Sequence, residues 1–203
     1  MGNEMASTTM SGARTLQRAL LWRRLDAPGA EHFLMWETAE GPQLEGTAVV
    51  ALDGVPLCAH YNITCSPSWE TRAVRVTLAR GATVRALDIA VDDRYRWRLD
   101  GRHIDALDGC RDIDLGVSPS TNSLPIRRLA LSVGEQREVT AAWIRFPELT
   151  LSPLPQCYTR TGERRYQYES RGGAFVAQLE VDDLGLVTRY GEFWERVAEL
   201  RGG

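Results

Sequence analysis

The chain has 203 residues, of which 43% are hydrophobic and 25% are charged, a balance typical of a folded globular protein and not of a disordered one. The formal net charge is −3 and the 24 basic residues, all arginine, are spread along the chain, so we expect no nucleic-acid partner. No stretch approaches the roughly 20 apolar residues of a membrane-spanning helix, so we expect no transmembrane segment.

The beginning of the chain differs in composition from the rest. Residues 1–15 are rich in Ser, Thr, Met and Gly and lack the apolar core of a secretory signal. We therefore expect a disordered tail over residues 1–15, a single domain over residues 16–200, and a cytoplasmic location.

The cysteines and histidines favour neither disulfides nor a metal site. There is no Cys-x-x-Cys, and in one continuous strand Cys58 and Cys65 would lie roughly 23 Å apart. The three histidines, His32, His60 and His103, are scattered, whereas a structural zinc site needs clustered ligands. We expect no metal and no cofactor.

Alternation with a period of two residues dominates the first half of the chain. Over residues 55–65 the odd positions are apolar or aromatic and the even positions are mostly polar, and residues 73–78 repeat the pattern. In residues 94–99 three apolar side chains alternate with three arginines. Each segment predicts a strand with one buried face and one solvated face.

Short turns separate these segments. Asp53-Gly54, Arg80-Gly81 and Asp100-Gly101 stand between them, and hairpin turns favour Asn, Asp and Gly. The short spacing predicts antiparallel neighbours, because parallel strands need long helical crossovers. Residues 48–52 and 139–146 are apolar on both faces, which predicts a sheet that curls over itself or is covered by a helix.

Residues 107–129, LDGCRDIDLGVSPSTNSLPIRRL, break the alternation. Asp112 and Asp114 are two positions apart, so their carboxylates point the same way if the segment is a strand. The prolines that follow predict a loop, because proline cannot donate to a sheet ladder. A short helical turn is expected from Ser123, and it would carry Arg127 and Arg128. Ordered loops on a rigid sheet are where binding groups collect.

The end of the chain follows helical spacing. Over residues 193–200 the apolar side chains and the charged side chains occupy opposite faces of a helix. The predicted fold class is therefore mainly β, a strongly curved antiparallel β-roll with a C-terminal helix that closes or flanks it.

The runs DGCRDIDLG and TNSLPIRRL resemble the signature of the putative glycolipid-binding family of bacterial proteins. Trp69 before Thr71-Arg72, Trp97 before Asp100-Gly101, Tyr158, and the ending VDDLGLVTRY extend the similarity over about residues 16–196. The resemblance implies a spiral β-roll, similar to bacterial lipoprotein-carrier domains that hold acyl chains in a concave sheet. It also implies a small amphipathic partner, a glycolipid or an acyl compound.

The candidate ligand-binding residues combine polar groups of residues 107–129 with aromatic platforms. A sugar offers hydroxyls to Asp, Asn and Arg and an apolar face to an aromatic ring, while a concave apolar sheet would take an acyl chain at about 0.8 kcal/mol per buried CH₂. The set is Trp69, Arg72, Trp97, Asp112, Asp114, Asn122, Arg127, Arg128 and Tyr158.

Three alternatives remain beside non-catalytic binding. The aspartates and arginines of residues 112–128 also suit an ion-pair network that holds the loop on the sheet. Asp112 and Asp114, roughly 6 to 7 Å apart along a strand, would suit a hydrolase that acts on a sugar-containing substrate. The arginine stripe of residues 94–99 would suit a protein-interaction module.

Overall fold

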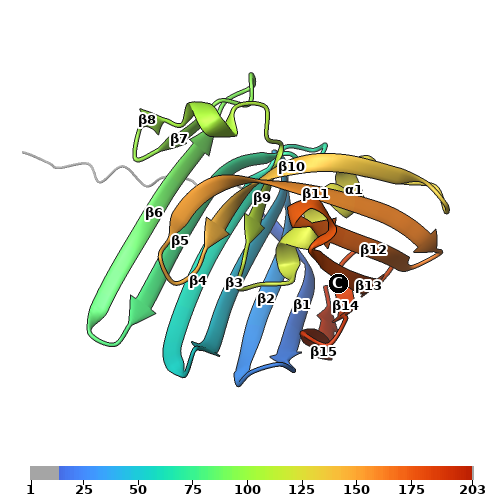
Figure 1. The fold of residues 1–203 in the computed structure, drawn as a ribbon, viewed down its shortest axis with the longest axis horizontal. Helices are drawn as coiled ribbons and strands as arrows, with labels where there is room; N and C mark the ends of the chain where they lie inside the picture. Colours follow the sequence, from blue (N-terminus) through green and yellow to red (C-terminus); the bar gives the residue numbers. More distant parts are fainter. Residues whose placement is uncertain (1–13, 203) are drawn as a thin grey trace, which may run out of the picture.

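The computed structural model describes residues 14–202, and most of them lie in β-strands (Figure 1). Residues 1–13 of the expected tail lie outside the described residues, whereas Arg14 and Thr15, also expected in the tail, begin a strand. Eight strands make up the first half: β1 (Arg14–Arg24), β2 (Gly29–Thr38), β3 (Gly41–Leu52), β4 (Val55–Cys65), β5 (Thr71–Arg80), β6 (Thr83–Val91), β7 (Trp97–Leu99) and β8 (Arg102–His103). Each strand pairs antiparallel with the next one.

The second half holds the short helices and seven more strands. It begins with η1 (Asp105–Leu107), β9 (Asp112–Leu115), η2 (Ser120–Asn122) and α1 (Ser123–Leu129). It continues through β10 (Gln136–Arg145), β11 (Thr150–Gly162), β12 (Arg165–Ser170), η3 (Arg171–Gly173), β13 (Phe175–Val181), β14 (Val187–Tyr190) and β15 (Trp194–Arg201). The helical turn expected from Ser123 is confirmed by α1. Among residues 14–202, no helix has the length and apolar character needed to cross a membrane.

Within the described chain the fifteen strands form one sheet, in the order β8-β7-β6-β5-β4-β3-β2-β1-β15-β14-β13-β12-β11-β10-β9. The first half runs outward from β1 to one edge. The chain then passes to the opposite edge at β9 and returns strand by strand to β15, which pairs with β1 in the middle of the sheet. The pairs are antiparallel except β9 with β10, so the predicted mainly β, mostly antiparallel fold is confirmed.

The sheet rolls up until its edge strand β9 meets β5, near the other end of the sheet. The backbone N–H of Thr71, at the start of β5, donates to the carbonyl of Arg111 at 2.9 Å, and the N–H of Ile113 donates to the Thr71 hydroxyl at 3.1 Å. In Figure 1 the long strands β10 and β11 arch across the hollow side of β1–β6, with β9 and α1 beneath them. The predicted curvature is therefore present.

The hollow side of β1–β6 is filled by the main hydrophobic core. Of the alternating residues expected to face inward on β4, Val55 is half-buried and the other five are buried: Leu57, Ala59, Tyr61, Ile63 and Cys65. Residues of β9 and of the loop after it, among them Ile113, Leu115 and Val117, join the same cluster from the opposite side. The apolar hollow expected to hold an acyl chain is thus packed with side chains along these strands.

The prediction of a C-terminal helix is wrong, because residues 194–201 form strand β15. The register runs from Arg18 opposite Arg201 to Arg24 opposite Trp194, with one bulge. Without β15, the backbone N–H and C=O groups along β1 would lose these partners, and that need outweighs the local helical spacing. Val197 and Leu200, which would have formed the apolar face of a helix, are 48% and 61% exposed.

The strand expected over residues 94–99 is shorter than predicted and starts at Trp97. The backbone N–H groups of Arg94 and Arg96 both donate to the Asp92 carboxylate, and Tyr95 has a φ of 57°. Asp92 therefore organises a turn, which removes Tyr95 from the strand face that Trp97 occupies. The arginine stripe does not form one continuous strand face.

The prediction that both faces of the strand are buried holds within residues 139–146 and fails for residues 48–52. On β10 the neighbours Ala141 and Ala142 are both buried, which confirms two-sided coverage there. On β3 Ala48 and Val50 are buried, but Val49 between them is 56% exposed. Strand β3 lies on the outer wall of the roll, so only its inner face is covered.

Candidate ligand-binding site

A cavity of about 250 Å³ lies within the second half of the chain, between β9 and β10 on one side and β12–β15 on the other, and Arg24 at the end of β1 and Asp26 just after it also line it. Its polar lining consists of Arg24, Asp26, Asp114, Ser118, Asn122, Ser170 and Arg171. Its aromatic lining consists of Trp143, Tyr168, Phe175, Tyr190, Phe193 and Trp194. Four further hollows in the described chain, of about 170 to 540 Å³, have no aromatic lining. The combination of rings and polar groups makes the first cavity the candidate site.

Four aromatic side chains form one wall of this cavity. The ring centroids of Tyr168 and Phe175 lie 6.0 Å apart, those of Tyr168 and Tyr190 6.1 Å, and those of Phe175 and Phe193 5.5 Å. Most of these contacts are edge-to-face, an arrangement that contributes about 0.5–1.5 kcal/mol per pair beyond burial. The rings come from adjacent strands or the turn before β15, so the sheet fixes their positions.

Asp114 of β9 is the acidic group at the centre of the site. The Gln156 side-chain amide donates to its carboxylate at 2.5 Å, and the Tyr168 hydroxyl lies near it. Both groups are neutral. Burial raises the pKa of Asp114 to about 6, although Gln156 and Tyr168 favour its ionised form. Trp143 lies beside Asp114 on the neighbouring strand, as its register partner.

Asp112 has a different role from Asp114, two positions away. Its carboxylate is 1% exposed and accepts hydrogen bonds from both Nε and a terminal nitrogen of Arg128. Burial raises the pKa of Asp112, and the Arg128 guanidinium opposes that shift. This bidentate pair fastens α1 to β9, as the ion-pair alternative predicts for these two residues.

Asn122 and Tyr158 connect the site to the strands behind it. Asn122 lines the cavity, and its side-chain oxygen accepts a hydrogen bond from the Tyr158 hydroxyl at 3.0 Å. Tyr158 itself is 1% exposed. Its ring packs against Tyr168, with centroids 5.1 Å apart. Tyr158 therefore orients Asn122 and supports the aromatic wall without lining the cavity.

The other four predicted residues lie elsewhere. Trp97 is fully buried in the main core, where its indole nitrogen donates to a backbone carbonyl. Arg127 is exposed, with its guanidinium 5.1 Å from the ring of Trp69. Arg72 forms an ion pair with Glu70 at 3.2 Å. Of the nine predicted residues, the cavity brings together Asp114 and Asn122, with Tyr158 directly behind.

Sequence reasoning missed most of the aromatic wall. Tyr168, Phe175 and Tyr190 lie 54 or more positions after Asp114, and no local pattern connects them to it. Phe193 was expected on a helix face. The available signal was the number of aromatic residues among the last 40 positions, which indicates a cluster but not the place where it forms.

A buried hydrogen-bond network supports the polar side of the cavity. The hydroxyl of Ser118, a cavity residue, donates to Glu31 at 2.8 Å, and the Tyr61 hydroxyl donates to the same carboxyl oxygen. Glu31 is fully buried, and this burial raises its pKa to about 8. The Tyr61 ring lies flat against its cross-strand partner Gly46, where an added Cβ would come within 2.2 Å of the ring. The network anchors the loop after β9 to β2 and β4.

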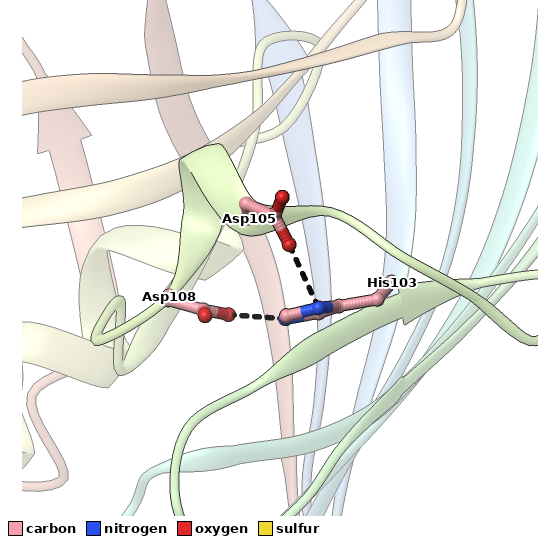
Figure 2. A group of neighbouring side chains, drawn as sticks. All are labelled: His103, Asp105 and Asp108. Atoms are coloured by element: carbon pink, nitrogen blue, oxygen red, sulfur yellow. Dashed lines mark hydrogen bonds and ion pairs between the residues drawn. The ribbon is translucent and has the colours of Figure 1, made fainter.

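A separate polar cluster surrounds His103, as Figure 2 shows. Nδ1 lies 2.8 Å from a carboxylate oxygen of Asp105, and Nε2 lies 2.8 Å from one of Asp108. The two carboxylates therefore contact different nitrogens of one imidazole ring, and one ligand atom from each of the three residues lies within 4.8 Å of the others. The contacts explain how η1 is held against the β7–β8 hairpin, a role that the scattered histidines did not indicate.

The chain matches the family model described as "Putative glycolipid-binding" over residues 19–196. It belongs to this family. A crystal structure of a DUF1089 family protein from Pseudomonas aeruginosa resembles it with a TM-score of 0.73 and 31% sequence identity, over 97% of this chain and all of that one. Comparison with curated proteins gives no match. The family resemblance that the sequence shows in residues 107–129 is thus confirmed.

Proposed function

We propose that this protein binds an amphipathic ligand, a glycolipid or a related compound, and holds its polar head group in the cavity beside Asp114. The observation that carries the proposal is the pairing of an aromatic wall with Asp114, Asn122 and Ser118 in one cavity. A sugar ring has the matching chemistry, because its hydroxyls suit the polar groups and its C–H face suits the rings. The family description is consistent with such a ligand.

The size of the cavity limits how much of the ligand it holds. About 250 Å³ is slightly below the ~300–1,000 Å³ of sites that enclose a whole small molecule. The hollow side of β1–β6 is occupied by the main core. A head group therefore enters the cavity, and the hydrocarbon part of the ligand remains outside its mouth.

The contacts of Asp112 and Asp114 support binding without catalysis more than they support a hydrolase. A two-carboxylate glycosidase needs both groups free to exchange protons with the substrate or water. Asp112 is instead engaged by both donors of Arg128 and does not line the cavity. Asp26, the other carboxylate that lines the cavity with Asp114, accepts two hydrogen bonds from Arg24. Asp114 therefore serves as a hydrogen-bond acceptor for the ligand.

This function can be tested by native mass spectrometry of the protein purified without detergent. Organic extraction and lipid analysis of the same sample then identify any bound compound. We expect a stoichiometric co-purified amphiphile, or its uptake from a bacterial lipid extract. A clean unliganded mass with no uptake would contradict the proposal.

A pair of tryptophan variants tests the position of the site. Trp143→Ala removes a ring from the cavity, and we expect it to reduce ligand retention by about tenfold. Trp36→Ala removes a ring from outside the cavity, where Trp36 donates to Glu45, and serves as the control. Equal retention by the two variants would place the ligand elsewhere.

A further inference from the structure

The carboxylate of Asp114, which is partly buried, differs from the fully buried carboxylates in what surrounds it. Asp112 is paired with Arg128, and Asp182 with Arg196 at 2.7 Å. Glu31 is held by hydroxyl groups, and its raised pKa of about 8 keeps it protonated at neutral pH. Within residues 14–202, by contrast, no arginine or histidine nitrogen lies within 4.0 Å of the Asp114 carboxylate.

The two arginines that line the cavity, Arg24 and Arg171, are engaged with other groups. Arg24 forms two hydrogen bonds with Asp26, at 2.7 and 3.0 Å, and this contact lowers the pKa of Asp26. Arg171 lies with its guanidinium 5.4 Å from the centroid of Trp143. The negative charge inside the cavity therefore has no counter-charge from the protein in contact with it.

The walls beside Asp114 also suit a positive charge. The faces of aromatic rings attract cations, by about 0.5–1 kcal/mol at exposed sites and more where water is excluded. The Trp143 ring beside Asp114 already has the guanidinium groups of Arg145 and Arg171 within 5.4 Å of its centroid. Tyr168 and Tyr190, which also line the cavity, lie near enough to Asp114 for its charge to raise the pKa of both hydroxyls. A neutral head group placed here would cover the carboxylate without compensating it, which is costly.

We infer that the head group bound beside Asp114 carries a protonated primary amine, as in an amino sugar with a free amino group, and that this ammonium donates to the Asp114 carboxylate. The inference rests on the proposed function and names its ligand class. A primary ammonium fits better than a quaternary one, because Asp114 accepts hydrogen bonds and a quaternary nitrogen has none to donate.

The ionisation of Asp114 gives the site a direction of pH dependence. With a pKa of about 6, the carboxylate is mostly ionised at pH 7 and protonated at pH 5. The other titratable groups near it are Asp112 on β9, Tyr158 on β11, Tyr168 on β12, Tyr190 on β14, and at the rim Arg24, Asp26 and Arg171. The tyrosines have raised pKa values and the arginines stay charged, so Asp114 controls amine binding between pH 5 and 7.

Two matched amphiphiles test the inference: octyl glucoside and its 2-amino-2-deoxy counterpart. Both are titrated into the full chain by calorimetry at pH 7, below their critical micelle concentrations. We expect the amino compound to bind about tenfold more tightly or better. We expect this preference to disappear at pH 5. The N-acetylated compound, which has the same ring but no charge, is expected to bind like the glucoside.

The Asp114→Asn variant tests whether the preference for the amino compound depends on the Asp114 carboxylate. We expect the ratio of the two dissociation constants to fall to about one in this variant. Asp88→Asn, which removes a carboxylate from an exposed ion pair with Arg75 on the outer face, is expected to keep the wild-type ratio. A preference that survives in Asp114→Asn would overturn the assignment.

The two proposals fail in distinguishable ways. Equal binding of the amino and neutral glycosides by the wild-type protein overturns the ammonium inference and leaves the proposed function standing. Binding of none of the three amphiphiles, together with a clean unliganded mass from the lipid extract, overturns both.

Discussion

At the scale of single residues, two carboxyl groups of the site and its supporting network, the fully buried Glu31 and the partly buried Asp114, are held in different ways. Glu31 accepts hydrogen bonds from Tyr61 and Ser118, and its pKa of about 8 keeps it neutral at pH 7. Asp114 lines a cavity and is mostly ionised at that pH. Burial raises both pKa values, and the larger shift belongs to the more deeply buried group.

Glu31→Gln tests the protonation state of Glu31. The folded-state pKa is raised above the unfolded value of 4.5, so the favourable contribution of Glu31 is fully present below about pH 4.5 and is lost as pH rises towards 8. Glutamine has no such dependence. We therefore expect the stability of the variant relative to wild type to increase by at least ~1 kcal/mol from pH 5 to pH 9, as measured by urea unfolding. A constant difference would show that Glu31 does not titrate with a raised pKa.

At the scale of elements, α1 and β15 show that interactions with distant residues fix the position of short segments. The interaction is an ion pair for α1 and backbone pairing for β15. Helix α1 has seven residues, too few for stability by itself, and it is fastened to β9 by the Arg128–Asp112 pair. Strand β15 forms because β1 requires a partner along its length. In both cases the contact that fixes the element comes from a distant part of the chain.

The adjacent arginines of α1 make a matched pair of variants. Arg128→Met leaves the Asp112 carboxylate buried without its counter-charge, so we expect a loss of about 3–5 kcal/mol in the free energy of unfolding. Arg127→Met removes an exposed guanidinium beside Trp69, so a loss of about 1 kcal/mol or less is expected. Urea denaturation measures both. Asp112→Asn in the Arg128→Met background should recover part of the loss, and comparable losses from the two single variants would contradict the assigned role.

At the scale of the whole molecule, the roll is one continuous sheet with a core shared between its halves. Residues of β9 and the loop after it pack into the same cluster as β2–β6, and β1 pairs with β15. The first half does not cover its apolar face alone. This arrangement favours cooperative unfolding of the described domain.

We therefore expect a single unfolding transition. Urea curves followed by tryptophan fluorescence and by far-ultraviolet circular dichroism should coincide, because Trp22, Trp69, Trp97 and Trp194 all belong to the shared core. Two separated transitions would show that the halves fold independently.

The central site was partly predictable from sequence. Asp114 and Asn122 could be selected because residues 107–129 lose the strand alternation and concentrate polar groups. Whether a given carboxylate is free or paired could not be predicted, since Asp112 and Asp114 have the same local pattern and differ only in the distant groups that meet them, Arg128 and Gln156. The role of Trp97 could not be predicted either. Its position in a strand is compatible both with a ligand-binding platform and with the hydrophobic core, where the structure places it.

The sequence by itself determined the strands and their buried faces, because period-two alternation is a property of neighbouring residues. It also determined the family, through the runs around Asp112 and Asn122. Tertiary structure alone decided that residues 194–201 form a strand, since the deciding partner β1 lies more than 160 residues away along the chain. It also decided where the cavity forms, because the aromatic wall and Asp114 meet only when the sheet rolls up and brings β12–β14 against β9.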